Sequence, residues 1–162
     1  MGIKFINKDT IDLEEIIDGM EFQLRDMSAY FNFIDNKIVV ITDTEISKAK
    51  NITISEIKEL SDIEIEFMDQ ALDIVKSGNY IQLPTNYDIF EYKIMESFCN
   101  NIEDEELKES MNNDIVGRGA FSRFKESIYK HNIELDWFMY RYDTLKQIAI
   151  EWCDENKVRY RE

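Results

Sequence analysis

Residues 30–41 read Tyr-Phe-Asn-Phe-Ile-Asp-Asn-Lys-Ile-Val-Val-Ile, and this stretch decides the fold class. The aromatic and apolar residues 30–34 favour a strand, and the β-branched run 38–41 favours a second strand. Residues 35–37, Asp-Asn-Lys, lie between them and have the composition of a tight turn. The stretch therefore predicts an antiparallel β-hairpin.

A further strand and several helices are predicted around this hairpin. Tyr80–Leu83 is short and β-prone and ends at Pro84, so it is a candidate third strand beside the hairpin. Apolar residues at helical spacing predict seven helices. Three are in the first half of the chain: one begins at Thr10, one runs from Thr42 or Asp43 to about Lys50, and one runs from Asp62 to about Ser77. Four follow: from Asp88 or earlier to about Asn101, from the acidic run 103–106 to about Val116, from about Gly119 to about Lys130, and from about Glu134 to Glu155. Residues 51–55 are predicted to form a connector, and Val158–Tyr160 is predicted to form a short edge strand.

These elements predict an α+β fold. It is a mostly helical single domain over residues 1–162, with a small two- or three-stranded antiparallel sheet near the N-terminal half. In the helix that begins at Asp62, the apolar side chains expected to point inward are Ile63, Phe67, Leu72 and Val75. Apolar residues make up 44% of the chain, which argues against disorder.

The charge of the chain is strongly acidic and unevenly distributed. Lys and Arg number 19 and Asp and Glu number 34, which gives a formal net charge of -15. Residues 1–116 carry 10 of the basic and 26 of the acidic residues, whereas residues 117–162 carry 9 and 8. This balance excludes a generally basic nucleic-acid binder. The acidic part is either a solvated face, a surface that meets a cationic partner, or a mimic of nucleic acid.

Two cysteines and one histidine limit the chemistry that the chain can carry. Cys99 and Cys153 are far apart and in no paired motif, so we expect two reduced, buried thiols in a cytoplasmic protein without a membrane span. His131 is expected to close a helix at its C-terminus. The sequence holds none of the common motifs of hydrolases, metalloenzymes or nucleotide-binding loops, and we expect no cofactor and no metal.

The most distinctive stretch is residues 117–125, Gly-Arg-Gly-Ala-Phe-Ser-Arg-Phe-Lys. Gly117 is expected to end one helix with a positive φ. A Gly-x-Gly turn before a helix, with three cations nearby, could hold a phosphate. Helical geometry places Phe121, Phe124 and Ile128 on one face, where we expect a core stripe. Arg118 and Lys125 then lie on one side of this stripe and Arg123 on the other. The three cations therefore either pair with carboxylates of the chain itself, bind a phosphate-type ligand, or contact a protein partner.

The last predicted helix has an arginine within an apolar stripe. Residues that share one helical face are Trp137, Arg141, Leu145, Ile148 and Trp152, and Phe138, Tyr142 and Ala149 are expected to widen it. Arg141 is either stacked on an aromatic ring and paired with a carboxylate, or a residue that recognises an anion in an aromatic pocket.

The block that begins at Gly117 is part of a pattern that covers nearly the whole chain. The pattern comprises residues 30–41, Leu83-Pro84, Tyr92-x-Ile94-Met95-Glu96-x-Phe98, Gly117-Arg118-Gly119-Ala120-Phe121-x-Arg123-Phe124-Lys125, Trp137-Phe138-x-Tyr140-Arg141 and Ala149-Ile150-Glu151-Trp152-Cys153. It resembles the bacterial Uncharacterised Protein Family 0158. The resemblance implies one domain and a bacterial, cytosolic origin, and it implies no function because the family has none assigned. Ser122 and Phe138 stand where Arg and Tyr are expected in many relatives. The missing Arg at position 122 argues against a groove for an extended polyanion.

These observations favour a small acidic cytosolic binding or adaptor protein that is not an enzyme. Its contact surface would be the 117–125 turn and the last helix, and its partner another protein. The candidate contact residues are Arg118, Arg123, Lys125, Trp137 and Arg141. The alternative is a protein that binds, or an enzyme that acts on, a phosphorylated small molecule or nucleotide through Arg118, Lys125 and Arg141. A weaker alternative is a nucleic-acid mimic; a membrane or nucleic-acid partner is not expected.

Overall fold

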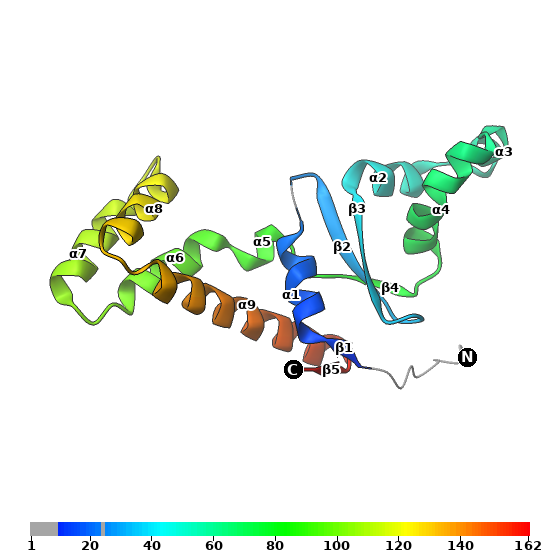
Figure 1. Ribbon diagram of the computed structural model, residues 1–162. Helices are drawn as coiled ribbons and strands as arrows, with labels where there is room; N and C mark the ends of the chain where they lie inside the picture. Colours follow the sequence, from blue (N-terminus) through cyan, green and yellow to red (C-terminus); the bar gives the residue numbers. More distant parts are fainter. Residues whose placement is uncertain (1–9, 24) are drawn as a thin grey trace. The chain divides into compact units, whose positions relative to one another are not determined.

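The computed structural model describes residues 10–23 and 25–162, and most of them are helical (Figure 1). The helices are α1 (Leu13–Glu21), α2 (Asp43–Asn51), α3 (Ile54–Glu59), α4 (Asp62–Lys76), α5 (Asn86–Ile89), α6 (Glu91–Asn100), α7 (Glu105–Asp114), α8 (Ala120–Lys130) and α9 (Glu134–Asn156). The strands are β1 (Ile11–Asp12), β2 (Met27–Asn32), β3 (Lys37–Thr42), β4 (Tyr80–Gln82) and β5 (Tyr160–Arg161). The predicted α+β class, mostly helical with a small antiparallel sheet in the N-terminal half, is confirmed.

The predicted hairpin forms two strands of a three-stranded antiparallel sheet, in which β2 is the central strand. Strand β2 pairs with β3, so that Tyr30 lies opposite Val39, and on its other side with β4, so that Tyr30 lies opposite Gln82. The strand order is β3-β2-β4. The third strand predicted at residues 80–83 is thereby confirmed. Asn36 has a φ of 61° in the hairpin turn, a conformation that asparagine adopts more readily than most residues.

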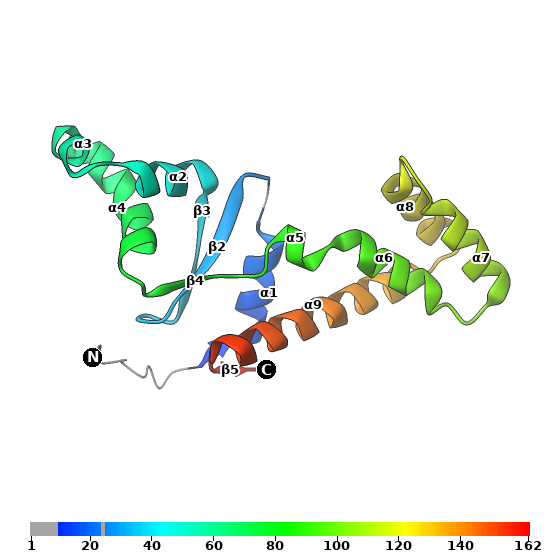
Figure 2. The same ribbon diagram turned by 180° about the vertical axis from the view of Figure 1, so that it is seen from behind.

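Helices cover both faces of this sheet (Figures 1 and 2). Alternate strand residues point to one face, where Ile41 packs in a buried cluster with residues of α2 and α4. On the opposite face, Ile38 lies close to Gly19 of α1. The ring of Trp152, near the end of α9, contacts the buried Phe31 at a centroid distance of 6.2 Å. The fold thus buries the hairpin on two sides.

The two ends of the described chain pair with each other. Strands β1 and β5 are parallel, with Ile11 opposite Tyr160. The helix expected from Thr10 therefore begins later, at Leu13, because Ile11 and Asp12 belong to a strand and the Asp12 side chain caps the helix at Glu14 N. The edge strand expected at residues 158–160 is displaced to β5 and forms its own small sheet.

Helix α3 lies in a region that the sequence pattern presents as a connector. Both α3 and α4 begin with a capping box, made by Thr53 with Glu56 and by Ser61 with Glu64. The expected inward orientation of Ile63 is wrong, because its side chain is exposed. Leu72 and Val75 do pack against the core, and the side chain of Phe67 lies outside the described part.

The described residues form two compact units. The first unit comprises the described part of residues 1–85 together with residues 149–162, and the second comprises residues 86–148. The second unit holds α5 to α8 and most of α9. The single helix expected over residues 88–101 is broken at Phe90, whose φ is 45°. The expectation of one domain over residues 1–162 stays a prediction.

Both cysteines are buried and free of disulfide bonds. Burial raises the pKa of Cys99 to about 11, and burial together with the charge of Asp154 raises the pKa of Cys153 to about 12. Each thiol is therefore protonated and a poor nucleophile at neutral pH. Among the described helices, none combines the length and the apolar character that a bilayer span requires.

Candidate functional site

The turn between α7 and α8 is built on two glycines. Helix α7 ends at Asp114, and α8 begins at Ala120. Between them, Gly117 has a φ of 74° and Gly119 a φ of 81°. The positive φ predicted for Gly117 is confirmed. Because such values are costly for a residue with a Cβ atom, glycine is the residue that allows so short a connection here.

The Arg123 guanidinium holds this turn from the side of α8. Its Nε donates to the carbonyl oxygen of Asp114 at 2.8 Å, Nη1 to that of Arg118 at 2.8 Å, and Nη2 to that of Val116 at 2.6 Å. Carbonyl groups at the end of a helix lack partners within that helix. Arg123 therefore caps α7 and closes the loop, and all three of its donor nitrogens face the chain itself.

A second side chain of α8 also binds at the C-terminal end of α7. The Ser127 hydroxyl, one helical turn after Arg123, donates to the carboxylate of Asp114. By contrast, the side chains of Arg118 and Lys125 are exposed and have no partner among the residues that the structure describes. The three cations of the 117–125 block do not converge on one ligand position, as the helical geometry predicted.

Arg141 is held by a carboxylate of its own unit. Its Nε donates to Oε1 of Glu91 at 2.6 Å, and Nη2 donates to Oε2 at 3.3 Å. The left-handed residue Phe90 precedes Glu91 and starts α6. The two side chains are 27% and 37% exposed, so the pair is partly solvated. This geometry matches the carboxylate-paired interpretation of Arg141.

Trp137 lies in an aromatic cluster rather than on the surface. It is 8% exposed, and its ring centroid lies 4.8 Å from that of Phe124 and 5.3 Å from that of Phe98. The Phe98 ring also contacts Tyr140 at 5.5 Å. All these contacts are edge-to-face, the arrangement that aromatic rings prefer. The cluster joins α6, α8 and α9 within the second unit.

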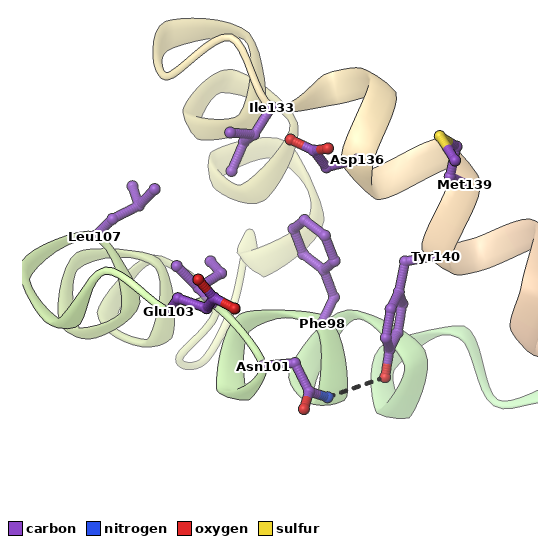
Figure 3. Close-up of a pocket in the computed structure, with 9 residues that line it drawn as sticks. Phe98, Asn101, Glu103, Leu107, Ile133, Asp136, Met139 and Tyr140 are labelled. Atoms are coloured by element: carbon purple, nitrogen blue, oxygen red, sulfur yellow. Dashed lines mark hydrogen bonds between the residues drawn. The ribbon is translucent and has the colours of Figure 1, made fainter.

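A hollow of about 480 Å³ opens beside this cluster (Figure 3). Its lining residues come from α6, the loop between α6 and α7, α7, and the start of α9 with the residue before it. They are Phe98, Asn101, Ile102, Glu103, Leu107, Ile133, Asp136, Met139 and Tyr140. Figure 3 shows the carboxylates of Glu103 and Asp136 on opposite sides of the hollow. Neither carboxylate has a hydrogen-bond or ion-pair partner in the described part of the chain.

The hydrogen-bond donors in the wall of the hollow are already engaged. The Asn101 side-chain amide donates to the carbonyl oxygen of Ser97 at 2.8 Å and to the hydroxyl of Tyr140 at 3.3 Å. That hydroxyl also shares a hydrogen bond of 2.7 Å with the hydroxyl of Ser97. Glu103 and Asp136 are the charged side chains of the lining, and their carboxylate oxygens accept hydrogen bonds and carry negative charge.

An exposed apolar stripe adjoins the hollow on α9. Leu135, Phe138, Met139 and Tyr142 are 68%, 53%, 59% and 37% exposed. Their spacing of three, four and seven residues places them on one helical face. Met139 belongs both to this stripe and to the lining of the hollow. The second unit thus presents a continuous apolar helix face beside an acidic hollow.

The comparisons with known proteins give a family and nothing beyond it. The family model described as Uncharacterised protein family (UPF0158) matches residues 7–161. The chain belongs to this family. No curated protein and no solved structure matches the chain. Membership of the UPF0158 family therefore agrees with the resemblance seen in the sequence and supplies no activity or ligand.

The sequence pattern misses the hollow and the stripe of this UPF0158 protein. Phe138 and Tyr142 were expected to widen the buried face of the last helix, but both are exposed. Phe121, expected in the core stripe of α8, is also exposed. The spacing of Leu135, Phe138, Met139 and Tyr142 is the signal that could have identified the stripe. Among the described residues, no group of three or more His, Cys, Asp or Glu side chains could hold a metal ion.

Proposed function

We propose that this UPF0158 protein is a non-enzymatic binding or adaptor protein of the bacterial cytosol, and that it contacts a protein partner through the exposed face of α9. The observation that carries the proposal is the apolar stripe of Leu135, Phe138, Met139 and Tyr142. Single exposed apolar side chains are ordinary, whereas a contiguous apolar patch marks an interaction site. Aromatic and methionine side chains are also the types enriched at protein interfaces.

The residues that the sequence offered for the contact divide into two groups. Trp137, Arg123 and Arg141 support the surface from within, through the aromatic cluster, the turn and Glu91. Arg118 and Lys125 are exposed and remain open to a partner. The proposed contact surface therefore centres on α9, and the 117–125 turn contributes two cations to the surface of the same unit.

The alternative, a site for a phosphorylated small molecule or nucleotide, receives less support. It requires Arg118, Lys125 and Arg141 to face one concavity. None of the three lines the hollow of the second unit, and Arg141 binds Glu91. A thiol nucleophile is likewise disfavoured, because burial raises the pKa of both cysteines. The two buried, unpaired thiols fit a reducing compartment.

The test removes the apolar stripe without altering the hollow. The double variant Leu135→Ser/Phe138→Ser changes two side chains that do not line the hollow. A matched control is Phe22→Ser/Ile34→Ser in the first unit, because Phe22 and Ile34 are 66% and 53% exposed. Each protein is used as bait in an extract of the cells that make it, beside the wild type.

We expect the wild type and the control variant to retain the same protein partner and the stripe variant to lose it. Circular dichroism and thermal unfolding establish that both variants are folded. Retention by the stripe variant, or equal loss from the two variants, contradicts the proposed surface. Failure of the wild type to retain any protein contradicts the proposed function.

A further inference from the structure

The residues that line the hollow beside α9 indicate what kind of group could bind there. Its lining is largely apolar and aromatic, with residues such as Phe98, Leu107 and Met139, and two exposed carboxylates, Glu103 and Asp136, lie at its rim. A volume of about 480 Å³ is within the range of small-molecule and side-chain sites. An occupant must therefore pair an apolar stem with a polar group that complements two acceptors.

The local charge around the hollow is negative. Glu103 begins the run Glu103–Glu106, and Asp136 lies in the first turn of α9. Lys108 follows this run, but it pairs with Glu105 at 3.6 Å and does not line the hollow. No lysine or arginine is among the lining residues. Two unpartnered carboxylates without a local cation attract a positive group and repel a phosphate.

The hydrogen-bond pattern of the wall favours a group rich in donors. The amide of Asn101 and the hydroxyl of Tyr140 bond to each other and to Ser97, so they are engaged within the wall. What remains is a pair of carboxylates, each of which can accept two hydrogen bonds from a guanidinium. An arginine side chain has several donors in a plane and an apolar stem that packs on apolar surface.

We infer that the hollow receives an arginine side chain from a basic, amphipathic segment of the protein partner. The inference rests on the proposed function, because the same segment would lay its apolar side chains over the α9 stripe. Met139 belongs to both surfaces and makes them continuous. A small free cation could fill the hollow but would leave Leu135, Phe138 and Tyr142 uncovered. The continuity of hollow and stripe therefore favours a peptide chain over a free amine.

The probe is a fluorescein-labelled peptide in which arginines flank a pair of leucines. Its binding to the full chain is followed by fluorescence anisotropy at physiological salt, where weak long-range attraction is screened. A second peptide carries glutamine in place of each arginine. Arginine amide serves as a small cation without a peptide chain and is added as a competitor.

The decisive variants remove the two rim charges or two other charges of the same unit. Glu103→Gln/Asp136→Asn neutralises the hollow, and Glu109→Gln/Glu126→Gln neutralises two exposed carboxylates elsewhere. Both variants have the same net charge, so a difference between them reports the local contact. We expect the first to weaken peptide binding by about tenfold or more and the second by less than about twofold.

The remaining outcomes decide against the inference or in its favour. Equal weakening in both variants, equal affinity of the glutamine peptide, or no binding of the arginine peptide overturns it. Displacement of the peptide by an equal concentration of arginine amide also overturns it, because the site would then be one for a small cation. If Leu135→Ser/Phe138→Ser abolishes partner capture and the rim variant leaves peptide binding unchanged, the inference fails while the proposed function stands. If the stripe variant still captures the partner, the proposed function fails, and the inference that rests on it fails with it.

Discussion

The turn between α7 and α8 and the hollow beside α9 place charged side chains next to helix ends and use them in opposite ways. At the turn, Arg123 donates to three backbone carbonyl oxygens. At the hollow, Glu103 and Asp136 have no partner within the described residues. The most distinctive block of the sequence thus contributes its central cation to the fold. The charge available to a partner belongs to residues outside that block.

The largest expected effect is that of Arg123→Ala. The substitution leaves the carbonyl groups of Asp114, Val116 and Arg118 without their charged donor. Hydrogen bonds to charged groups contribute roughly 1.5–3 kcal/mol each when buried, and two of these three are exposed, so we expect a loss of about 2 kcal/mol. That corresponds to a decrease in Tm of about 4–8 °C.

The matched control is Arg118→Ala, which removes an exposed arginine five positions earlier. Because its side chain has no partner, the free energy of unfolding should change by less than about 0.5 kcal/mol. Urea titration of both variants measures the difference. Equal losses from the two substitutions would mean that the turn does not depend on Arg123.

The next largest effect on stability is expected from the two glycines of the turn, and it should differ between them. A Cβ atom at Gly117 would meet nothing within 4 Å, whereas one at Gly119 would lie 3.0 Å from Nη1 of Arg123. Gly117→Ala should cost about 1 kcal/mol for its positive φ alone, and Gly119→Ala about 1.5 kcal/mol because it also displaces the guanidinium. Thermal unfolding of both variants tests this order. A larger cost at Gly117 would contradict the role assigned to Arg123.

A smaller effect is expected from the ion pair of the same unit. Breaking a fully buried pair costs about 3–5 kcal/mol, but Arg141 and Glu91 are 27% and 37% exposed. We therefore expect a coupling energy of about 0.5–1 kcal/mol in a double-mutant cycle of Arg141→Ala and Glu91→Ala. The coupling should decrease in concentrated salt. A salt-independent coupling near 3 kcal/mol would show that the pair is more deeply buried than its exposure indicates.

Local patterns predicted the hairpin and the longer helices because their signals lie within a few residues. The alternation around Tyr30 and Val39, and the positive φ at Gly117, follow from side-chain chemistry at short range. Capping residues also decide where helices begin, as Thr53 and Ser61 do for α3 and α4. The connector expected at residues 51–55 shows that a capping box is easily overlooked where apolar periodicity is weak.

The hollow could not be predicted in the same way, because it depends on how three helices meet. An apolar stripe in a helical sequence does not show which of its residues another helix or strand will cover. Phe124 is buried by Trp137, whereas Phe121 of the same stripe is exposed. The pairing of Arg141 with Glu91 spans 50 residues and carries no local signal. Tertiary contacts of this kind decide which charged groups remain available.

The smallest expected effect completes the comparison, and it comes from the rim of the hollow. Glu103→Gln and Asp136→Asn should each change the free energy of unfolding by less than about 0.5 kcal/mol, because neither carboxylate has a partner to lose. Asp136 lies in the first turn of α9, where a negative charge contributes a few tenths of a kcal/mol. Relief of repulsion within an acidic unit opposes that loss. Urea titration of each variant beside Arg123→Ala measures the contrast. A loss above about 1.5 kcal/mol from either variant would show that its carboxylate stabilises the fold, and the charge at the hollow would then not be available to a partner.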